Sequence, residues 1–380
     1  MTNPSIAPRR SPLDSARLKA YCRLMPLLFV CYIIAYIDRT NVASAKLTMS
    51  EDMPAFDSWV MGFGSGIFFL GYFLLEIPGS IIVEKWSARK WICRIMVTWG
   101  IMAAATAFVT TPLQFYIVRF LLGMAEAGFF PGVLVYLTHW FPSKDRARAI
   151  SYFLVASPIA MMIGPWISAY FIDIGRTTIV DGEPIMNPTL LGLRGWQWIY
   201  IFWGVPAVVA GFVVLFYLTD RPKQAMWLTE EERDALETVL AQEKAAKSHA
   251  KHQSLLAALT NPRVLLLSLA YFGIVTANYG IEFFLPSILR QWYDFEPKDV
   301  ILLAILPSLL VIAGQLFVGW SSDRFHERRW HSVMPVVLGA IVLSLSTLTQ
   351  GNIYLSMTCF IIGAAGMKSY MPAFWSLPTL

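Results

Sequence analysis

The chain has 380 residues, of which 56% are hydrophobic and 14% are charged, and its mean hydropathy is +0.55. This composition is too apolar for a water-soluble domain and predicts an integral membrane protein. The formal net charge of +5 does not indicate nucleic-acid binding, because the basic residues gather beside the apolar segments, where membrane topology explains them.

The N-terminal segment is polar and basic and contains several prolines. It lacks the apolar core and the small-residue cleavage site of a secretory signal. We therefore expect residues 1–20 to form a disordered tail on the cytosolic side of the membrane.

Long apolar segments recur along the rest of the chain. A bilayer core of about 30 Å is crossed by roughly 20 helical residues, and apolar windows of that length recur from Tyr21 onward. The predicted spans are residues 21–43, 58–81, 91–110, 113–138, 147–172, 195–219, 263–290, 299–320, 331–349 and 353–378. The predicted fold class is an all-α polytopic membrane protein with about ten transmembrane helices.

Basic residues flank the predicted spans unevenly. They gather before the first span, between the second and third, and after the fourth, at Arg9, Arg10, Arg17, Lys19, Arg23, Lys85, Arg89, Lys90, Arg94, Lys144, Arg146 and Arg148. The alternate connections carry few basic residues. The positive-inside rule then places the N-terminus in the cytoplasm and predicts a multi-pass protein of the cytoplasmic (inner) membrane.

Four charged residues lie inside predicted spans, Asp38 and Arg39 in the first and Arg119 and Glu126 in the fourth. A charge at membrane depth costs roughly 3 kcal/mol on insertion scales, so such residues commonly face a water-filled path. Arg119 and Glu126 are seven residues apart and share one helix face. Adjacent Asp38 and Arg39 point about 100° apart, so one can face a cavity while the other pairs with a neighbouring helix. Because Asp38 and Arg119 lie at similar depth, we expect an ion pair between them.

These residue types suit the joint binding of an organic anion and protons. The planar guanidinium group binds a carboxylate through two parallel hydrogen bonds, so Arg39 and Arg119 are candidate substrate anchors. A carboxyl group in such a site can bind and release a proton, so Asp38 and Glu126 are candidate proton-coupling groups. The alternative is a purely structural ion-pair network that steadies the first and fourth helices.

Uncharged side chains add further candidates for substrate binding. Asn278 and Tyr279 lie beside Gly280 in the seventh span, where they can donate hydrogen bonds to a hydroxyl or carboxyl group. Tyr36 and Tyr72 offer amphipathic rings to a cavity. Polar contacts between helices and ordinary packing are the alternatives.

Two more charges fall inside predicted spans, Glu282 in the seventh and Lys368 in the tenth. We expect Glu282 to lie at the outer surface of the membrane. Lys368 is expected to snorkel to the interface or to pair with a carboxylate.

The longest polar stretch divides the chain into two halves. Residues 220–262 carry mixed charges and are expected to form a cytosolic connector with a helix of its own. Residues 21–219 hold six predicted spans, and residues 263–380 hold four. Transporters are often built from two six-helix halves, so the second bundle is incomplete by that standard.

One charge pattern occurs after the second span and again after the eighth. Each copy has an acid, a base directly after it, and two more bases at the fifth and sixth positions after the acid. The residues are Glu84, Lys85, Arg89 and Lys90 in the first copy, and Asp323, Arg324, Arg328 and Arg329 in the second. We expect a cytoplasmic charge latch that joins helices in one conformation and parts in another. The alternative is basic decoration of the kind the positive-inside rule requires.

The repeated loop is similar to the signature loop of the major facilitator superfamily. The segment Tyr36-Ile37-Asp38-Arg39-Thr40-Asn41 resembles the first-helix motif of the anion:cation symporter family within it. Further agreement lies in the segments Arg119 to Pro131, Trp140-Phe141-Pro142, Gly164-Pro165, Trp196-Gln197-Trp198 and Pro372-Ala373-Phe374-Trp375. The resemblance covers essentially the whole chain from Tyr21 onward.

The resemblance implies a major facilitator fold, with a central site between two bundles that rock about it. It implies proton-coupled symport of a small organic anion: a sugar acid, a dicarboxylate such as tartrate, or an aromatic carboxylate. It also implies substrate or proton roles for the four span charges of the first and fourth helices. Asn41 belongs to the first-helix motif, and the resemblance places Trp375 in the substrate site.

The sequence departs from the family pattern in two respects. Ser80 and Ser87 stand where the superfamily loop has Gly, and Glu84 stands where it has Asp. The family carries two further helices beyond Trp375, so we expect a fragment or a shortened relative. The alternatives to symport are anion exchange or uniport without protons, and a non-transporting remnant or sensor that binds the anion.

Residue clusters for other functions are missing from the sequence. The histidines and cysteines show no metal-ligand spacing, and no nucleophile with a His and an orienting acid falls within the spans. We therefore expect no metal, no cofactor and no enzymatic activity. The expected partners are a small organic anion, protons and the lipid bilayer, without nucleic acid, and the expected state is a monomer.

Overall fold

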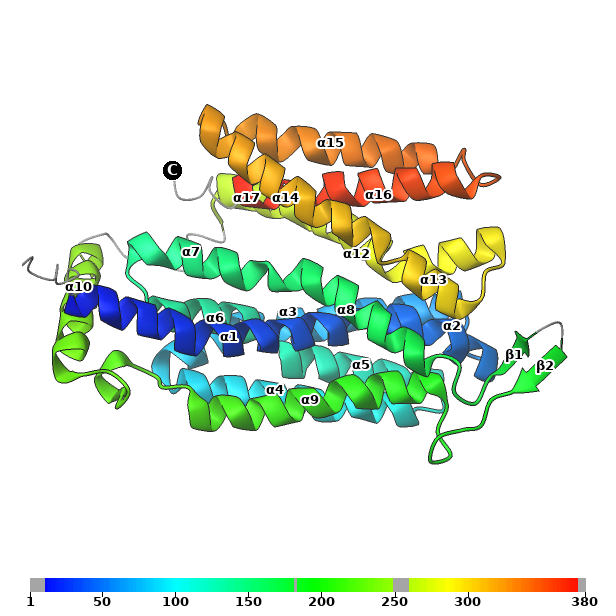
Figure 1. Ribbon diagram of the computed structural model, residues 1–380, viewed down its shortest axis with the longest axis horizontal. Coiled ribbons are helices and arrows are strands. Elements are labelled where there is room, and N and C mark those ends of the chain that lie inside the picture. The colour runs from blue at the N-terminus through cyan, green and yellow to red at the C-terminus, as the bar shows by residue number, and fades with distance from the viewer. Residues whose placement is uncertain (1–10, 181–182, 249–259, 375–380) are drawn as a thin grey trace, which may run out of the picture.

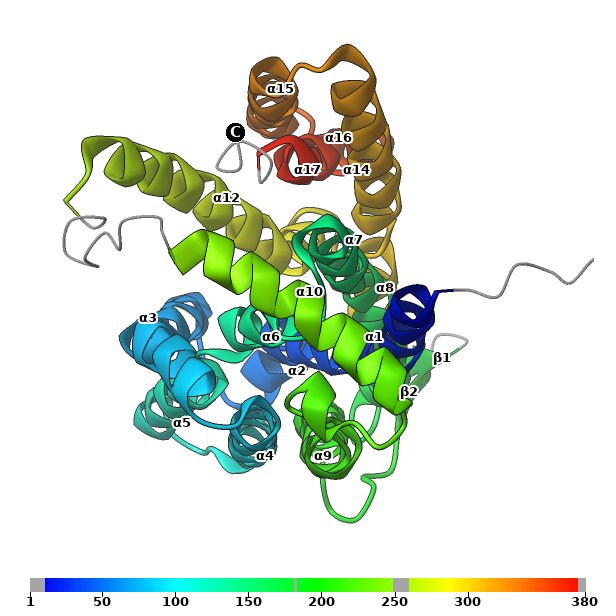
Figure 2. The ribbon, with the colours of Figure 1, turned by 90° about the vertical axis from the view of Figure 1, so that its left-hand side faces the viewer.

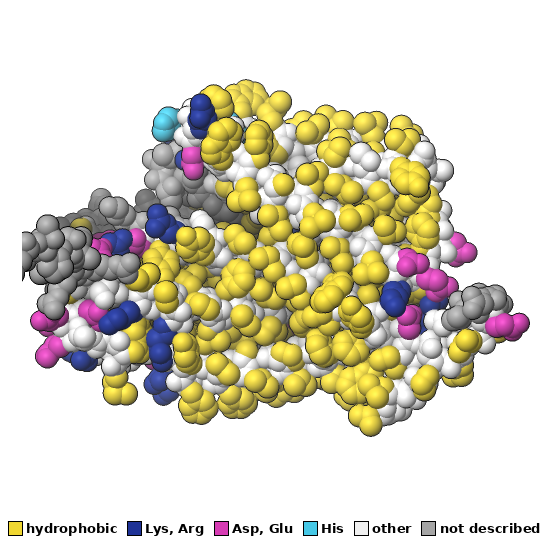
Figure 3. All heavy atoms as spheres, viewed as in Figure 1, with side chains coloured by type: hydrophobic (Ala, Val, Ile, Leu, Met, Phe, Trp, Pro, Cys, Tyr) yellow, Lys and Arg dark blue, Asp and Glu magenta, His cyan; other side chains and the backbone are white. Residues whose placement is uncertain are grey.

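The structure is a computed structural model of the chain and describes residues 11–180, 183–248 and 260–374. Its helices form two bundles that lie side by side, with one amphipathic helix crossing an end of the first bundle (Figures 1 and 2). On the face shown in Figure 3, hydrophobic side chains cover the middle and charged side chains gather at the two ends. Such a distribution is typical of a protein whose middle lies in lipid.

The first bundle contains the helices of the N-terminal half. They are α1 (Pro12–Thr40), α2 (Val42–Asp52), α3 (Ser58–Lys85), α4 (Ala88–Ala105), the 3-10 helix η1 (Thr106–Phe108), α5 (Pro112–Glu126), α6 (Phe129–Thr138), α7 (Ser143–Leu154), α8 (Ala156–Phe171) and α9 (Gly195–Tyr217). The connector follows with the 3-10 helix η2 (Pro222–Gln224) and helix α10 (Glu230–Ser248). It therefore contains the helix that its charged sequence predicts.

The second bundle contains the helices after the connector. They are α12 (Pro262–Tyr293), α13 (Pro297–Leu303), α14 (Leu306–Phe325), α15 (Arg329–Ser346), α16 (Ile353–Ser369) and α17 (Met371–Phe374). Helices α15 and α16 pack along each other, and α14 packs on α16, so that this bundle has its own interior (Figure 2).

Nine helical segments of the described chain are long and apolar enough to cross a membrane. They are Pro12–Asp52, Ser58–Glu84, Ala88–Phe108, Pro112–Thr138, Arg148–Phe171, Gly195–Tyr217, Pro262–Tyr293, Pro297–Phe325 and Arg329–Ser346. Each overlaps one of the first nine predicted spans, which confirms those predictions. The tenth predicted span contains α16, with 17 residues, and the short α17, while its last residues lie outside the described part of the chain.

The predicted disordered tail differs from the structure after Ser11. Helix α1 begins at Pro12, because the Ser11 side chain caps it and proline suits the first helical position. Its first turns are then held from outside: Lys19 pairs with Glu232 of α10 at 2.7 Å. The prediction is therefore wrong for residues 12–20, and the ten residues before Ser11 lie outside the described chain.

The fold is helical as predicted, apart from a short β-hairpin between α8 and α9. Its strands are β1 (Thr177–Val180) and β2 (Glu183–Met186), which pair antiparallel with Thr177 opposite Met186. The sequence carries a signal for it, since β-branched residues precede an Asp-Gly pair, which favours tight hairpin turns. We call this end of the molecule the hairpin end and the opposite end the α10 end (Figure 1).

Four of the nine spans of the described chain each consist of two α-helices, and two of them carry predicted substrate- or proton-binding residues. Helices α1 and α2 form one span interrupted at Asn41, and α5 and α6 form another interrupted at Ala127 and Gly128. Gly128 has a φ of 82°, in the left-handed region that glycine adopts at little cost, and the backbone of Gly79 approaches it closely. Both interruptions come just after the residues predicted to carry the chemistry of their span.

Ion pairs join the two bundles at the hairpin end. Arg290 of α12 pairs with Glu51 of α2 and also donates a hydrogen bond to the Leu47 carbonyl oxygen. Arg176, beside the hairpin, lies 2.6 Å from Glu296. In the described parts of the chain, the ion pairs between the two bundles all lie at this end.

We expect Gly71→Ala to lower the melting temperature by several degrees, because α3 and α5 touch through their glycines. A Cβ on Gly71 would overlap the Phe120 carbonyl oxygen, and one on Gly123 would overlap that of Phe68. Overpacking of this kind costs about 1–3 kcal/mol. Gly66→Ala on the same helix is the matched control, since a Cβ there meets no atom of the described chain within 4 Å. Equal melting of the two variants in detergent would contradict this view of the α3–α5 contact.

Candidate functional site

A cavity of about 470 Å³ lies between the two bundles, on the α10 side of the ion pairs that join them. It is lined by α1, α3, α6, α7 and α8 from the first bundle and by α12, α14, α16 and α17 from the second. The charged lining residues are Arg39, Glu76, Glu282 and Lys368. The aromatic ones are Tyr32, Tyr36, Phe69, Tyr72, Phe129, Phe130, Tyr271, Tyr279 and Tyr370.

The first bundle holds a buried ion pair whose basic member, Arg39, lines this cavity. Arg39, near the end of α1, pairs with Glu126, the last residue of α5. Only 15% of the Arg39 side chain and 1% of the Glu126 side chain are exposed. The Arg39 guanidinium also donates a hydrogen bond of 2.7 Å to the Tyr279 hydroxyl of α12 and lies 4.9 Å from the centre of the Tyr72 ring. One guanidinium thus links an acid of its own bundle to a tyrosine of the other.

The second bundle contributes a matching pair. Lys368 of α16 forms an ion pair with Glu282 of α12. The hydroxyl of Tyr36, on α1 of the first bundle, donates to Glu282 at 3.0 Å, and Lys368 donates to that hydroxyl at 3.2 Å. The site therefore holds two acid–base pairs, one in each bundle, and each contacts a tyrosine of the opposite bundle.

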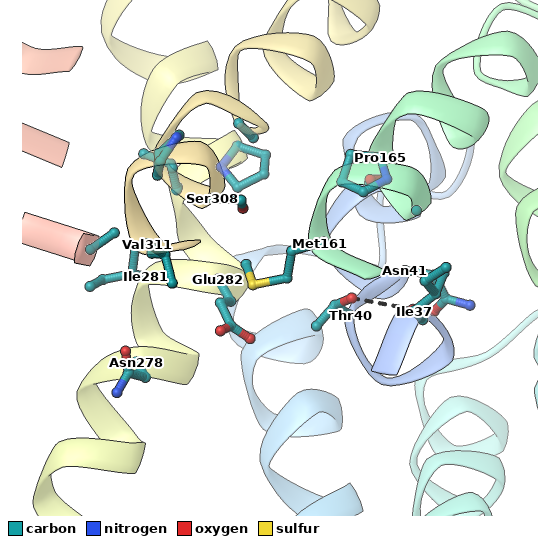
Figure 4. A pocket seen from close by; sticks show the side chains of 18 of the residues that line it. Ile37, Thr40, Asn41, Met161, Pro165, Asn278, Ile281, Glu282, Ser308 and Val311 are labelled. Carbon is teal, nitrogen blue, oxygen red and sulfur yellow. Dashed lines mark hydrogen bonds between the residues drawn. The ribbon is translucent and has the colours of Figure 1, made fainter. Parts of the chain in front are cut away.

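A smaller pocket of about 60 Å³ adjoins the cavity toward the hairpin end. Figure 4 shows that it lies between α1 and α8 on one side and α12 and α14 on the other, with the Met161 side chain directed toward Glu282. The lining of this pocket is mainly apolar and includes Asn41.

The predicted ion pair between Asp38 and Arg119 is wrong. Asp38 is 1% exposed, and its carboxylate accepts hydrogen bonds from the Trp99 indole N–H at 2.6 Å and from the Asn41 amide at 3.1 Å. These neutral donors satisfy the carboxylate without a cation. The acid that pairs with a guanidinium at this depth is Glu126, and the guanidinium is that of Arg39.

Arg119 is fully buried behind the cavity wall. Its Nε donates a long hydrogen bond of 3.4 Å to the Gly64 carbonyl oxygen, while its two terminal nitrogens have no hydrogen-bond partner in the described chain. Its guanidinium lies 4.9 Å from the centre of the Phe68 ring, and that of Arg39 lies 5.7 Å from the same centre. The guanidinium groups of both arginines therefore contact the Phe68 ring. Arg119 is not among the residues that line the cavity.

Most of the remaining predicted binding residues lie at the main cavity. Tyr36, Tyr72, Asn278 and Tyr279 line the main cavity. The Asn278 amide donates to the Met367 carbonyl oxygen at 3.0 Å, so part of its hydrogen-bonding capacity ties α12 to α16. Trp375 lies outside the described residues.

Three charged residues of the cavity were not among the predicted site residues. Glu282 was expected at the outer surface of the membrane, and Lys368 at the interface or paired with a carboxylate. The structure places both on the cavity wall and pairs Lys368 with the Glu282 carboxylate. Glu76 was not singled out, although it falls in the second predicted span; its carboxylate accepts from the Gly128 N–H at 3.3 Å. The signal that could have identified these three residues is their charge, because each falls inside a predicted span.

The residues of the predicted latch make their described contacts within their own bundles. Arg89 lies 3.3 Å from Asp220, at the end of the first bundle, and Arg328 lies 2.6 Å from Asp323. The side chain of Lys85 lies outside the described part. None of the described ion pairs of the latch residues joins the two bundles. The latch is predicted to form in one conformation and to part in another, so it stays a prediction.

Known proteins that this chain resembles in sequence or in fold are named as transporters. Residues 28–380 match the sequence family described as the Major Facilitator Superfamily. The chain is 40% identical over 362 residues to a putative tartrate transporter of Agrobacterium vitis, covering 95% of this chain and 80% of that protein. It is 40% identical over 356 residues to the putative metabolite transport protein NicT of Pseudomonas putida, covering 94% and 78% of the two chains. The fold is similar to that of the xylose transporter XylE from E. coli, with a TM-score of 0.68, 11% identity, and coverage of 94% and 84%.

We expect Glu126→Ala to destabilise the protein by about 3–5 kcal/mol, because it leaves the Arg39 guanidinium buried without its acid. The double variant Arg39→Met, Glu126→Met should lose less, since it leaves no charge unpaired. The measurement is thermal or chemical unfolding of the purified protein in detergent. Glu183→Gln, on the exposed strand β2, serves as the control. If the single variant unfolds like the control, the pair does not carry the stability assigned to it.

Proposed function

Because this chain belongs to the Major Facilitator Superfamily, whose members are membrane transporters and not enzymes, we propose that it carries a small organic anion together with protons across the cytoplasmic membrane. The mechanism is alternating access, in which the two bundles rock about the cavity between them. The observation that carries the proposal is the Arg39–Glu126 pair, of which Arg39 lines the cavity and contacts Tyr279 of the other bundle.

The pair couples the anion to a proton by exchange of partners. A substrate carboxylate binds the guanidinium fork of Arg39 through parallel hydrogen bonds and displaces the Glu126 carboxylate. Glu126 is then a buried acid without its cation, and it takes up a proton to become neutral. Release of the anion restores the ion pair and expels the proton, so the two solutes move together.

Asp38 and Arg119 take supporting roles in this scheme. Asp38 is a second buried carboxyl beside the first, held by Trp99 and Asn41, and is the further candidate for proton binding. Arg119 does not touch the substrate in this scheme, and its guanidinium contacts the same Phe68 ring as that of Arg39.

The state of the molecule fits a cavity that faces the cytosol. Arg290 and Arg176 fasten the bundles at the hairpin end, and the cavity lies on the other side of these contacts. The basic flanks of the spans assign the α10 end to the cytosol. In the opposite state, these ion pairs separate and the charge latch at the α10 end can form.

The class of substrate follows from the site and from the relatives. Two cationic side chains among the described lining residues suit a carboxylate, and a relative at 40% identity is named a putative tartrate transporter. Nine aromatic side chains also line the cavity, which suits either a sugar acid stacked against rings or an aromatic acid.

Transport in proteoliposomes tests the proposal. Labelled tartrate should accumulate when the outside is made acidic, and a protonophore should abolish accumulation. Arg39→Ala should reduce uptake at least about tenfold, since a charge-assisted hydrogen bond contributes about 1.5–3 kcal/mol. Glu126→Gln, a permanently neutral acid, should keep exchange of internal for external tartrate but lose accumulation driven by the pH gradient.

Glu183→Gln on β2 is again the control and should transport like the unmodified protein. Uptake that persists undiminished with the protonophore would favour exchange or uniport instead. Uptake that survives Arg39→Ala would remove the proposed anchor.

A further inference from the structure

We infer that Lys368, Glu282 and Tyr36 form a second carboxylate-binding subsite, and that the substrate therefore carries two carboxylate groups, one held by each bundle. This inference rests on the proposed function, in which Arg39 holds the first carboxylate. It assigns a role to the ion pair of the second bundle, which the exchange at Arg39 does not use.

The Lys368 side chain extends out of its own bundle. Its ammonium group contacts the Tyr36 hydroxyl of α1 at 3.2 Å and the Met161 sulfur of α8 at 3.0 Å, both in the first bundle. The side chain lines the main cavity and is 12% exposed. These contacts with the first bundle are not needed to join α12 to α16.

The contact between α12 and α16 is already secured without this ion pair. The Asn278 amide of α12 donates to the Met367 carbonyl oxygen of α16, directly beside Lys368. Charges placed at membrane depth are costly, and such residues usually belong to a substrate or ion path. The ion pair of Lys368 with Glu282 is therefore better explained by a ligand than by helix packing.

The two pairs occupy equivalent places in the two halves. Arg39 and Glu126 belong to the first and fourth spans of the first half. Glu282 belongs to the first span of the second half, and Lys368 lies on α16, in the fourth segment predicted to span the membrane in that half. The order of charge is reversed, with the base on the first helix of one half and on the fourth helix of the other. A ligand with an anionic group at each end meets one cation from each bundle in this arrangement.

The spacing of the pairs favours a short substrate. Tyr36 and Arg39 are three residues apart on α1, and Tyr279 and Glu282 are three residues apart on α12. The contacts Arg39–Tyr279 and Tyr36–Glu282 therefore lie within about one helical turn, roughly 5 Å, of each other. Carboxylates separated by a chain of a few carbons, or on neighbouring positions of a ring, match this distance.

Matched pairs of acids test the inference on the purified full chain. Tartrate and threonate share a four-carbon hydroxylated chain but have two and one carboxylates, and phthalate and benzoate form the aromatic counterpart. We expect the dicarboxylate of at least one pair to bind about tenfold tighter or more than its monocarboxylate in calorimetric titration. The pair that shows the difference identifies the substrate as aliphatic or aromatic.

The double variant Lys368→Met, Glu282→Gln removes the second pair without leaving a charge unpaired. It should reduce the affinity for the dicarboxylate to that for the monocarboxylate and change the monocarboxylate affinity less than about twofold. The matched control is Lys19→Met, Glu232→Gln, which removes a lysine–glutamate pair outside the cavity and should leave both affinities unchanged. Tyr36→Phe, which keeps both charges, should reduce the preference in the same direction and serves if the double variant does not fold.

The outcomes separate the inference from the proposed function. Equal affinity for both members of each pair, or an equal loss for both in the double variant, overturns the second subsite while binding that depends on Arg39 still stands. Binding of every carboxylate that is indifferent to Arg39→Ala, or no binding of any of them, overturns the proposed function and the second subsite with it.

Discussion

The ion pair between Arg39 and Glu126 is the interaction on which the site depends. A guanidinium group at the depth of a bilayer is costly unless an acid or water accompanies it, and here the acid is almost completely buried. An anion that displaces this acid keeps the guanidinium paired. The same guanidinium donates a hydrogen bond to Tyr279 of the second bundle. A change of partner at Arg39 would therefore alter a contact between the two bundles. In the proposed mechanism, substrate binding, proton uptake and the movement of the bundles therefore all involve the Arg39 side chain.

The arrangement of the helices explains how this side chain is presented. The first span is interrupted at Asn41 and the fourth at Gly128, just beyond Arg39 and Glu126 respectively. Interrupted helices are common where transporters bind ions and substrates, because they bring polar groups to the middle of the membrane. Ion pairs fasten the hairpin end, so the contacts that a rocking motion must break lie away from the cavity. The ion pair at the cavity and the ion pairs that join the bundles at the hairpin end therefore involve different residues.

Much of the fold was predictable because lipid imposes strong rules on composition. The apolar windows located nine spans, and the charges inside them singled out Arg39 and Glu126, which the structure brings together as an ion pair. The partner of Asp38 was not predictable, since neighbours on a helix point in different directions and packing alone decided that Trp99 would reach its carboxylate. The pairing of Glu282 with Lys368 needed the fold as well, because 86 residues separate them in the sequence. The hairpin had a clear local signal, but a short extramembrane element does not alter the hydropathy pattern.

The most direct test of the exchange at Arg39 is the number of protons taken up when an anion binds. Calorimetric titration of the tightest-binding carboxylate in two buffers of different ionisation enthalpy gives this number, because protons drawn from the buffer add its enthalpy to the signal. The exchange predicts uptake of about one proton for each carboxylate that displaces an acid from its cation, and loss of that uptake in Glu126→Gln with binding retained. Binding with no proton uptake in the unmodified protein would contradict the mechanism.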